Sequence, residues 1–241
     1  PYLNPDFLKM VRYASAKKIY TATSTNAHYL NDAKAKETVE SGLDRLIISI
    51  DGSTQEVYQQ YRVGGQLNKV LEGAKNIVRW KKELKSKKPF VVFQFLVVKP
   101  NEHQLHDVKE LAREIGVDDV WFKTAQVYDY EKDPNQLIPS ISKYSRYIKN
   151  AKGETVPKNA LNNHCWKLWH ANVITWDGLV VPCCFDKDAM HQLGNLKMQS
   201  FKEVWHNDNY KQFRRELMSS RKNIDICANC SEGTKVWGSD E

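Results

Sequence analysis

Short apolar runs and longer amphipathic segments alternate along the first half of the chain. The apolar runs predict strands at residues 19–23, 46–50, 90–98 and 120–123. The segments between them carry apolar residues every three or four positions and predict helices near residues 31–41, 67–78 and 105–115. Such alternation is typical of βαβ units and a parallel sheet, so we expect an α/β fold. The run at 46–50 is almost wholly apolar, which predicts a strand covered on both faces.

Capping signals mark the starts of several predicted helices. The pair Asn4-Pro5 is suited to the cap and first position of an N-terminal helix. Two segments, Ser53-x-x-Glu56 and Ser200-x-x-Glu203, have the spacing of a capping box. These signals predict helices that begin directly after residues 4, 53 and 200.

Polar side chains fall at or near the ends of the predicted strands. They are Thr25, Asn26, Ser49, Asp51 and Gln94. Whether the sheet is open and doubly wound or part of a barrel, ligands bind at the carboxyl ends of parallel strands. Asp51-Gly52 is also an ordinary turn signal, so turn formation is the alternative explanation for that pair. The pattern as a whole predicts a ligand site at this edge.

The chain changes character after residue 125. Residues 126–160 are polar and turn-rich, with one weak helix expected within 137–150, and predict a linker. Residues 161–241 contain a predicted hairpin, formed by apolar runs at 172–175 and 179–181 around the turn Trp176-Asp177-Gly178. We therefore expect an α/β region over 1–125, a linker, and a small α+β region.

All five cysteines lie after residue 164. The hairpin brings Cys165 near Cys183, and the Cys227-x-x-Cys230 loop supplies two further sulfurs. Four thiolates suit either zinc or an iron–sulfur cluster. Zinc ribbons usually pair two Cys-x-x-Cys knuckles, whereas this chain has one, which favours iron–sulfur. Adjacent side chains diverge along a strand, so Cys184 is expected to be a buried thiol rather than a ligand.

Composition and charge limit the class of protein and the cellular location that we expect. The net charge is +7 and 27% of residues are charged, as in ordinary globular proteins. No apolar run approaches the roughly 18 residues of a membrane span, and the start at Pro1 does not resemble a signal peptide, so a cytoplasmic protein is expected. The lysines at positions 81, 82, 85, 87 and 88 fit a solvated helix end, and without interleaved aromatic residues they argue against nucleic-acid binding. The aromatic residues of the last region are expected in its core: Trp166, Trp169, Trp176 and Phe185.

Three groups of residues occur in a fixed order along the chain. The first is Ser24-Thr25-Asn26 at a strand end. The second is Ser49-Ile50-Asp51-Gly52, followed by Tyr58 and Tyr61-Arg62-x-Gly64-Gly65. The third is Cys165-x12-Gly178-x4-Cys183 with Cys227-x-x-Cys230, with Leu193-Gly194-Asn195 and Trp205 between them. Together they make the whole chain resemble radical S-adenosylmethionine (SAM) enzymes with a C-terminal SPASM or twitch domain.

The resemblance implies a partial (β/α)6 radical SAM barrel over residues 1–125 and an auxiliary-cluster domain over 161–241. It implies SAM binding at Thr25, Asn26, Ser49, Asp51 and Arg62, with Ser49 and Asp51 near the ribose and Arg62 near the carboxylate. A carboxylate accepts from ribose hydroxyls, and a guanidinium pairs a carboxylate with two hydrogen bonds. Cys165, Cys183, Cys227 and Cys230 would hold one auxiliary 4Fe–4S cluster, because the chain has too few cysteines for a second.

The Cys-x3-Cys-x2-Cys motif of radical SAM enzymes is absent, because no cysteine precedes Cys165. The resemblance implies that this motif, and the second 4Fe–4S cluster that it holds, lie upstream of Pro1. A complete enzyme would be an oxidoreductase or maturase that uses a 5′-deoxyadenosyl radical on a peptide or small molecule, with flavodoxin or ferredoxin as electron donor. No catalytic acid or base is predicted. The alternative is an inactive or truncated module that binds iron–sulfur or zinc and serves in protein interactions.

Overall fold

The computed structural model describes residues 1–233, and the chain divides into two compact units, Pro1–Ser145 and Arg146–Glu241. Each unit is described by itself below. The boundary falls within the segment that the sequence predicts as a linker. Within the described residues, no helix has the length and apolar character needed to cross a membrane.

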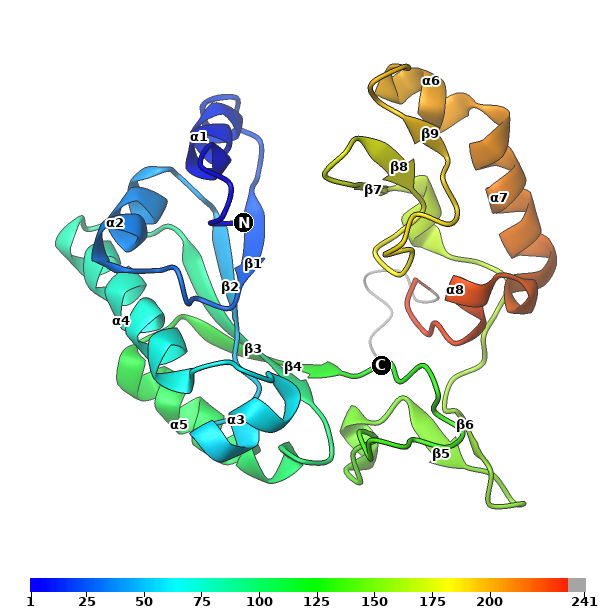
Figure 1. Cartoon of the computed structure of the whole chain (residues 1–241), viewed down its shortest axis with the longest axis horizontal. Helices are drawn as coiled ribbons and strands as arrows, with labels where there is room; N and C mark the ends of the chain where they lie inside the picture. Colours follow the sequence, from blue (N-terminus) through cyan, green and yellow to red (C-terminus); the bar gives the residue numbers. More distant parts are fainter. Residues whose placement is uncertain (234–241) are drawn as a thin grey trace. The chain divides into compact units, whose positions relative to one another are not determined.

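The first unit is built on a four-stranded parallel sheet (Figure 1). Its elements, in chain order, are α1 (Phe7–Ala16), β1 (Ala22–Thr25), α2 (Asp32–Glu40), β2 (Arg45–Ser49), α3 (Gln55–Tyr61), α4 (Leu67–Glu83), β3 (Phe90–Val97), η1 (Glu102–Gln104), α5 (Leu105–Ile115), β4 (Asp119–Thr124) and η2 (Ser142–Tyr144). The strands run in the order β1-β2-β3-β4, and every pair is parallel. The α/β fold class predicted from the sequence is therefore confirmed.

The core of this unit lies between the sheet and helices α2, α4 and α5, which lie along one face (Figure 1). Along β2 buried and half-buried residues alternate: Leu46 and Ile48 are fully buried, whereas Ile47 and Ser49 are not. The prediction that this strand is covered on both faces is therefore wrong for the unit itself. A run of apolar residues does not show which face of the strand the helices cover. When both faces carry apolar side chains, the sequence no longer alternates between apolar and polar residues.

Two of the predicted caps are also wrong. Helix α1 begins at Phe7 rather than after Asn4, because the Asn4 side chain instead accepts a hydrogen bond from the Asp6 N–H at 2.9 Å and forms a turn. Helix α3 is capped by Thr54, whose hydroxyl accepts from the Val57 N–H, and not by Ser53. The Ser53 N–H is bonded to the Gln104 side chain at 2.8 Å, a contact from far along the chain. The capping box at Ser200 and Glu203 is confirmed.

The second unit holds two small antiparallel sheets and short helices. Its elements are β5 (Tyr147–Lys149), β6 (Thr155–Pro157), η3 (Trp166–Trp169), β7 (Val173–Ile174), β8 (Leu179–Val181), β9 (Gly194–Asn195), α6 (Phe201–His206), α7 (Asp208–Ser220), η4 (Arg221–Asn223) and α8 (Asp225–Ala228). The predicted hairpin is confirmed as β7–β8, which β9 extends. The weak helix expected within 137–150 is limited to the three-residue 3-10 helix η2, and strand β5 follows it.

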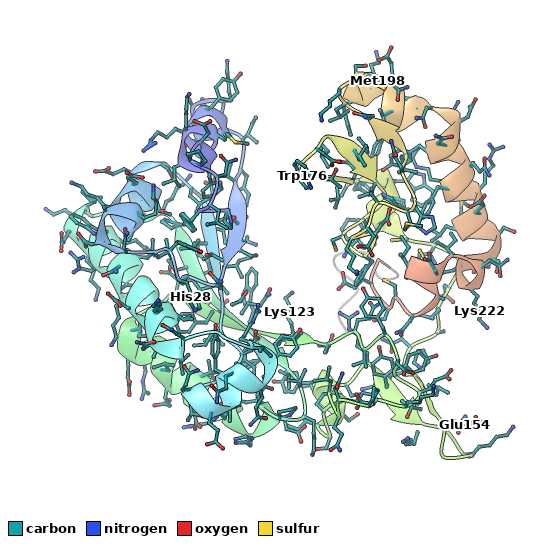
Figure 2. All side chains as sticks on the ribbon, in the orientation of Figure 1. His28, Lys123, Glu154, Trp176, Met198 and Lys222 are labelled. Atoms are coloured by element: carbon teal, nitrogen blue, oxygen red, sulfur yellow. The ribbon has the colours of Figure 1, made fainter. Side chains whose placement is uncertain are left out.

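A compact apolar core supports the cysteine region. It comprises Leu168, Val180, Leu193, Val204, Tyr210, Phe213, Leu217, Ile224 and Cys227. Two aromatic residues expected in this core lie at the surface instead. Trp176 is 97% exposed at the β7–β8 turn (Figure 2), and Trp169 is 41% exposed. Trp176 lies in the loop between β7 and β8, and its side chain is turned to solvent rather than packed against the core.

Candidate functional site

Four cysteines from three segments of the chain line one cavity in the second unit. Cys165 directly precedes η3, Cys183 follows β8 by two residues, Cys227 lies in α8, and Cys230 follows that helix. The rest of the lining is mostly apolar, with Leu168, Pro182, Phe185, Phe213, Leu217 and Ile226, and also includes Lys167, Cys184, Arg221 and Glu232. The fold therefore brings the four cysteines predicted from their spacing to one cavity.

The donor set suits an iron–sulfur cluster. Four cysteine thiolates are the usual ligands of a four-iron cluster, and four cysteines line this one cavity. In residues 1–233, no group of three or more His, Cys, Asp or Glu side chains is placed to hold a single metal ion. The residues present thus fit the cluster.

Burial raises the pKa of three of the thiols that line the cavity. The pKa of Cys183 rises to about 11 and that of Cys227 to about 12, in both cases chiefly because desolvation disfavours the thiolate. The pKa of Cys230 is raised by the same cause. Iron and zinc bind the thiolate, so loading this site must release these protons.

Cys165 is held by the segment after Cys230. The Trp166 N–H donates to the Gly233 carbonyl at 3.0 Å, which brings residue 233 against the cysteine. Gly233 has a φ of +72°, and a Cβ at this position would lie 2.2 Å from the Cys165 sulfur. Glycine is required here both for backbone conformation and for space.

Cys184 also lines the cavity but is exposed to solvent. The prediction of a buried thiol at this position is wrong. The chain turns directly after the cysteine pair, where the Asp186 N–H donates to the Cys183 carbonyl at 3.2 Å. In a turn, neighbouring side chains do not alternate between two faces as they do in a strand, so Cys184 reaches the surface while Cys183 stays half-buried.

No sequence pattern marks the charged residues near the cavity. Glu232 accepts from Lys167 and, at 3.1 Å, from Arg146, so the three form an ion-pair group. This group holds the pKa of Glu232 below its usual value despite burial, which acts to raise it. Arg221 is 1% exposed and touches several of the cysteine segments. In the sequence it stands beside exposed Lys222 in a basic pair that is typical of a surface.

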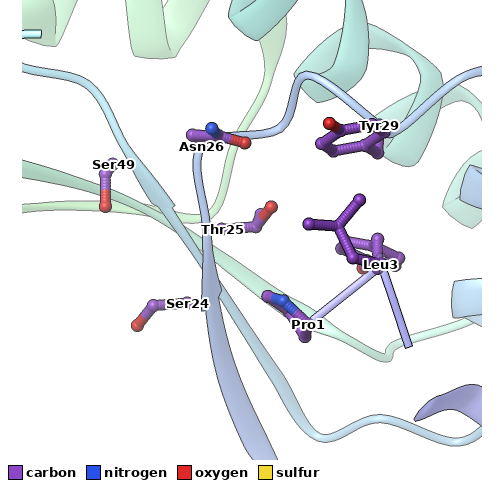
Figure 3. Close-up of a pocket in the computed structure, with 8 residues that line it drawn as sticks. Pro1, Leu3, Ser24, Thr25, Asn26, Tyr29 and Ser49 are labelled. Atoms are coloured by element: carbon purple, nitrogen blue, oxygen red, sulfur yellow. The ribbon is translucent and has the colours of Figure 1, made fainter.

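A second pocket lies at the carboxyl end of the sheet in the first unit. Thr25 pairs with Ile48, and Ser49 pairs with Gln94, so these parallel strands end at one edge. Figure 3 shows the open pocket at this edge, of about 310 Å³. Its lining residues are Pro1, Tyr2, Leu3, Ser24, Thr25, Asn26, Tyr29 and Ser49. The volume is at the lower end of the range for small-molecule sites.

Three of the predicted SAM residues, Thr25, Asn26 and Ser49, line this pocket, whereas Asp51 and Arg62 do not. Asp51 is buried and accepts from the Arg62 Nε at 2.5 Å and from the Leu96 N–H at 2.8 Å. The two residues predicted to contact different parts of SAM are therefore paired with each other.

Asn101 supports that pair and was not predicted. It is buried, and its side chain donates to the carbonyls of Asp51 and Leu96 at 3.0 and 2.9 Å. The only available signal is its place in the polar turn Lys99-Pro100-Asn101 directly after β3. Asn101 therefore fixes the backbone at the ends of β2 and β3.

The fold and the cysteine cavity define a class of protein: an α/β domain with a parallel sheet, followed by a small four-cysteine domain. Residues 165–231 match the SPASM family model, described as an iron–sulfur cluster-binding domain. The tungsten-containing aldehyde ferredoxin oxidoreductase cofactor-modifying protein of Pyrococcus furiosus is 25% identical over an alignment of 256 positions, which covers 96% of this chain and 71% of that protein.

Solved structures share the fold. BtrN in complex with AdoMet and 2-DOIA matches 96% of this chain and 69% of its own, with a TM-score of 0.50 and 18% identity. Streptococcus suis SuiB bound to the precursor peptide SuiA matches 94% of this chain and 56% of its own, with a TM-score of 0.61 and 12% identity. The chain is a homologue of radical SAM enzymes, and it carries a C-terminal SPASM domain.

Proposed function

We propose that this chain is part of a radical SAM oxidoreductase or maturase with one auxiliary 4Fe–4S cluster. The observation that carries the proposal is the single cavity lined by Cys165, Cys183, Cys227 and Cys230 within the region that matches the iron–sulfur family. These four cysteines would hold the cluster. When bound, SAM and the iron–sulfur clusters supply the one-electron chemistry that amino-acid side chains lack.

The residues of the first unit would bind and orient SAM at the carboxyl edge of the sheet. Thr25, Asn26 and Ser49 offer hydroxyl and amide groups to a ligand in the pocket. The Asp51–Arg62 pair would fix the loop after β2, with the partly exposed Arg62 able to reach the carboxylate of SAM. This assignment gives the predicted SAM residues two roles, contact with the ligand and support of its pocket.

The substrate class is a peptide or a small molecule. SuiB is described with a precursor peptide and BtrN with the small molecule 2-DOIA, and the two share the fold of this chain. The relative from Pyrococcus furiosus is named for modifying a cofactor. A flavodoxin or ferredoxin would serve as electron donor.

Metal analysis of the anaerobically purified chain tests the proposal. We expect about four iron and four sulfide per chain, and serine at Cys165 or Cys227 should abolish both. Zinc without sulfide would contradict the proposal and support a zinc-binding interaction module.

Enzymatic activity requires a Cys-x3-Cys-x2-Cys segment, which the printed sequence does not contain. The protein expressed from the whole reading frame, reduced and supplied with SAM, should form 5′-deoxyadenosine. A reading frame without this motif, or no 5′-deoxyadenosine from a fully loaded protein, would favour the inactive iron–sulfur module.

A further inference from the structure

Arg221 is the largest of the nearly fully buried side chains in residues 1–233, with 1% of its surface exposed. Among the described residues, its guanidinium donates only to backbone carbonyls. Nε donates to Cys227 at 3.1 Å, Nη1 to His164 at 3.0 Å and Asn162 at 3.5 Å, and Nη2 to Cys230 and to Glu232, the latter at 3.1 Å. A guanidinium has five N–H donors, and these five carbonyls account for all of them.

The accepting carbonyls belong to the segments that carry the cysteines. His164 directly precedes Cys165, and two of the other acceptors are the carbonyls of Cys227 and Cys230 themselves. One side chain therefore joins three of the four cysteine positions across more than 60 residues of sequence. The segments contain little regular structure of their own, so these hydrogen bonds help to hold them in place.

The charge of Arg221 has no carboxylate partner within the described part of the chain. The ion pairs found there involve other residues, and all five donors face neutral carbonyls. A buried cation without an opposite charge is unfavourable. Arg221 also lines the cysteine cavity, where four thiolates and their cluster would supply negative charge.

We propose that Arg221 is a positioning residue of the auxiliary-cluster site. The five-donor fork of its guanidinium orders the segments that carry the cysteines, and its positive charge raises the reduction potential of the cluster. This inference rests on the proposed function, because it requires a cluster in the cavity. One-electron reduction by an external donor adds one negative charge to the cluster, with no bond broken and no proton required. A fixed positive charge nearby stabilises the reduced form more than the oxidised form.

Two substitutions separate the fork from the charge. Arg221→Lys keeps the charge but has three donors in a different geometry, whereas Arg221→Met loses both. In the whole chain, reconstituted anaerobically with iron and sulfide, we expect both variants to retain less iron than the wild type. The midpoint potential, measured by redox titration monitored by electron paramagnetic resonance, should fall in Arg221→Met and stay near the wild-type value in Arg221→Lys. At the wild-type midpoint, the ratio of reduced to oxidised cluster should fall about tenfold in Arg221→Met, which is 59 mV for one electron.

Arg214→Met is the matched structural control. Arg214 lies on α7, which ends directly before Arg221. It donates to the Leu168 carbonyl at 3.0 and 3.1 Å and stacks on Tyr210 with 4.1 Å to the ring centre, but it does not line the cavity. Its loss should reduce thermal stability without moving the potential.

Distinct outcomes overturn the two proposals. A wild-type chain with zinc and no sulfide refutes the cluster and this inference together. A wild-type chain with the cluster, but with equal iron content and equal potential in Arg221→Met, refutes this inference alone. If Arg221→Met does not fold, Arg221→Lys tests both roles by itself. Iron content equal to the wild type in Arg221→Lys would contradict the role of the fork. A lowered midpoint potential in Arg221→Lys, which keeps the positive charge, would contradict the role of the charge.

Discussion

Burial gives the predicted ligand cysteines Cys183, Cys227 and Cys230 different chemistry from that of Cys184. The side chains of Cys227 and Cys230 are buried and that of Cys183 is half-buried, whereas Cys184 is exposed. Desolvation raises the pKa of Cys183 to about 11, so at neutral pH this side chain is a protonated thiol in the metal-free chain. A buried thiol is inert, while an exposed one reacts with the reagents that reach it. The pair Cys183-Cys184 thus combines a protected ligand with an accessible thiol.

Alkylation of the metal-free, reduced chain tests this difference. At pH 8, iodoacetamide should modify Cys184 before Cys183, Cys227 and Cys230. The thiolate is the nucleophile and its fraction grows as pH rises, so modification of Cys183 should accelerate by about tenfold per pH unit until about pH 11. Peptide mass spectrometry measures each rate, with Cys184→Ser as the control for the shared peptide. Equal rates at Cys183 and Cys184 at pH 8 would contradict the burial of the ligand.

The close approach of Gly233 to Cys165 leads to a second prediction at the scale of single residues. A Cβ here would lie 2.2 Å from the Cys165 sulfur, so Gly233→Ala should displace that ligand and lower the iron content of the reconstituted chain several-fold. Gly153 is a matched control, because its φ of +79° imposes a similar backbone strain but no atom lies within 4 Å of its Cβ position. Gly153→Ala should lower stability by about 1 kcal/mol and leave iron content unchanged. Equal iron losses in the two variants would show that backbone strain, rather than contact with Cys165, is responsible.

At the scale of elements, long-range contacts decide where helices begin. The sequence places a capping box at Ser53, but Gln104 binds the Ser53 N–H, and its side-chain nitrogen donates to the Thr54 hydroxyl at 3.2 Å. Thr54 then caps α3. Residues 53 and 104 are brought together only by the packing of the sheet, so a local motif could not identify the cap.

The caps of α3 can be compared directly by substitution. Thr54→Ala should lower the free energy of unfolding by about 1 kcal/mol, because it removes the acceptor for the Val57 N–H. Ser53→Ala should change it by less than about 0.5 kcal/mol, since the hydroxyl makes only an exposed contact with Asp107 at 3.4 Å. Urea unfolding of the whole chain measures both. A larger loss at Ser53 than at Thr54 would show that the box read from the sequence is the real cap.

Much of the fold and part of the site follow from the sequence for physical reasons. Hydrophobic periodicity predicts strands β2, β3 and β4 and helices α2, α4 and α5, because each buries apolar side chains. It places the first strand at residues 19–23, whereas β1 is Ala22–Thr25, because Ile19 and Tyr20 are exposed rather than packed in the sheet. Spacing predicts the four cysteines of the cavity, because a hairpin and a short loop place them. Arg221 could not be predicted, since its partners are backbone carbonyls, which no sequence pattern marks. The Asp51–Arg62 pair was missed because both residues also suit direct contact with a ligand.

At the scale of the whole molecule, the chain has two units with separate cores. We therefore expect cluster binding to stabilise only the unit that holds the cluster. The first unit has its own core around Leu46, Ile48 and Phe93. In the second, the cysteine segments depend on hydrogen bonds from Arg221 and on the cavity contents. A ligand that binds only the folded site stabilises by about 2.7 kcal/mol at a concentration 100 times its Kd. Cluster loading should therefore protect the segments around the cysteines and leave the parallel sheet unchanged.

Hydrogen exchange of the whole chain, with and without the cluster, measures this directly. Amides near Cys165, Cys183 and the segment 224–233 should exchange roughly 100-fold more slowly after loading, because exchange there requires the site to open. Amides of β2 and β3 should exchange at the same rate in both forms, since their protection comes from the sheet and its helices. A double variant with serine at Cys165 and Cys227 supplies the metal-free control under identical reconstitution. Equal slowing in β2 and β3 would mean that the cluster stabilises the chain as one cooperative body, and the two units would then not be thermodynamically separate.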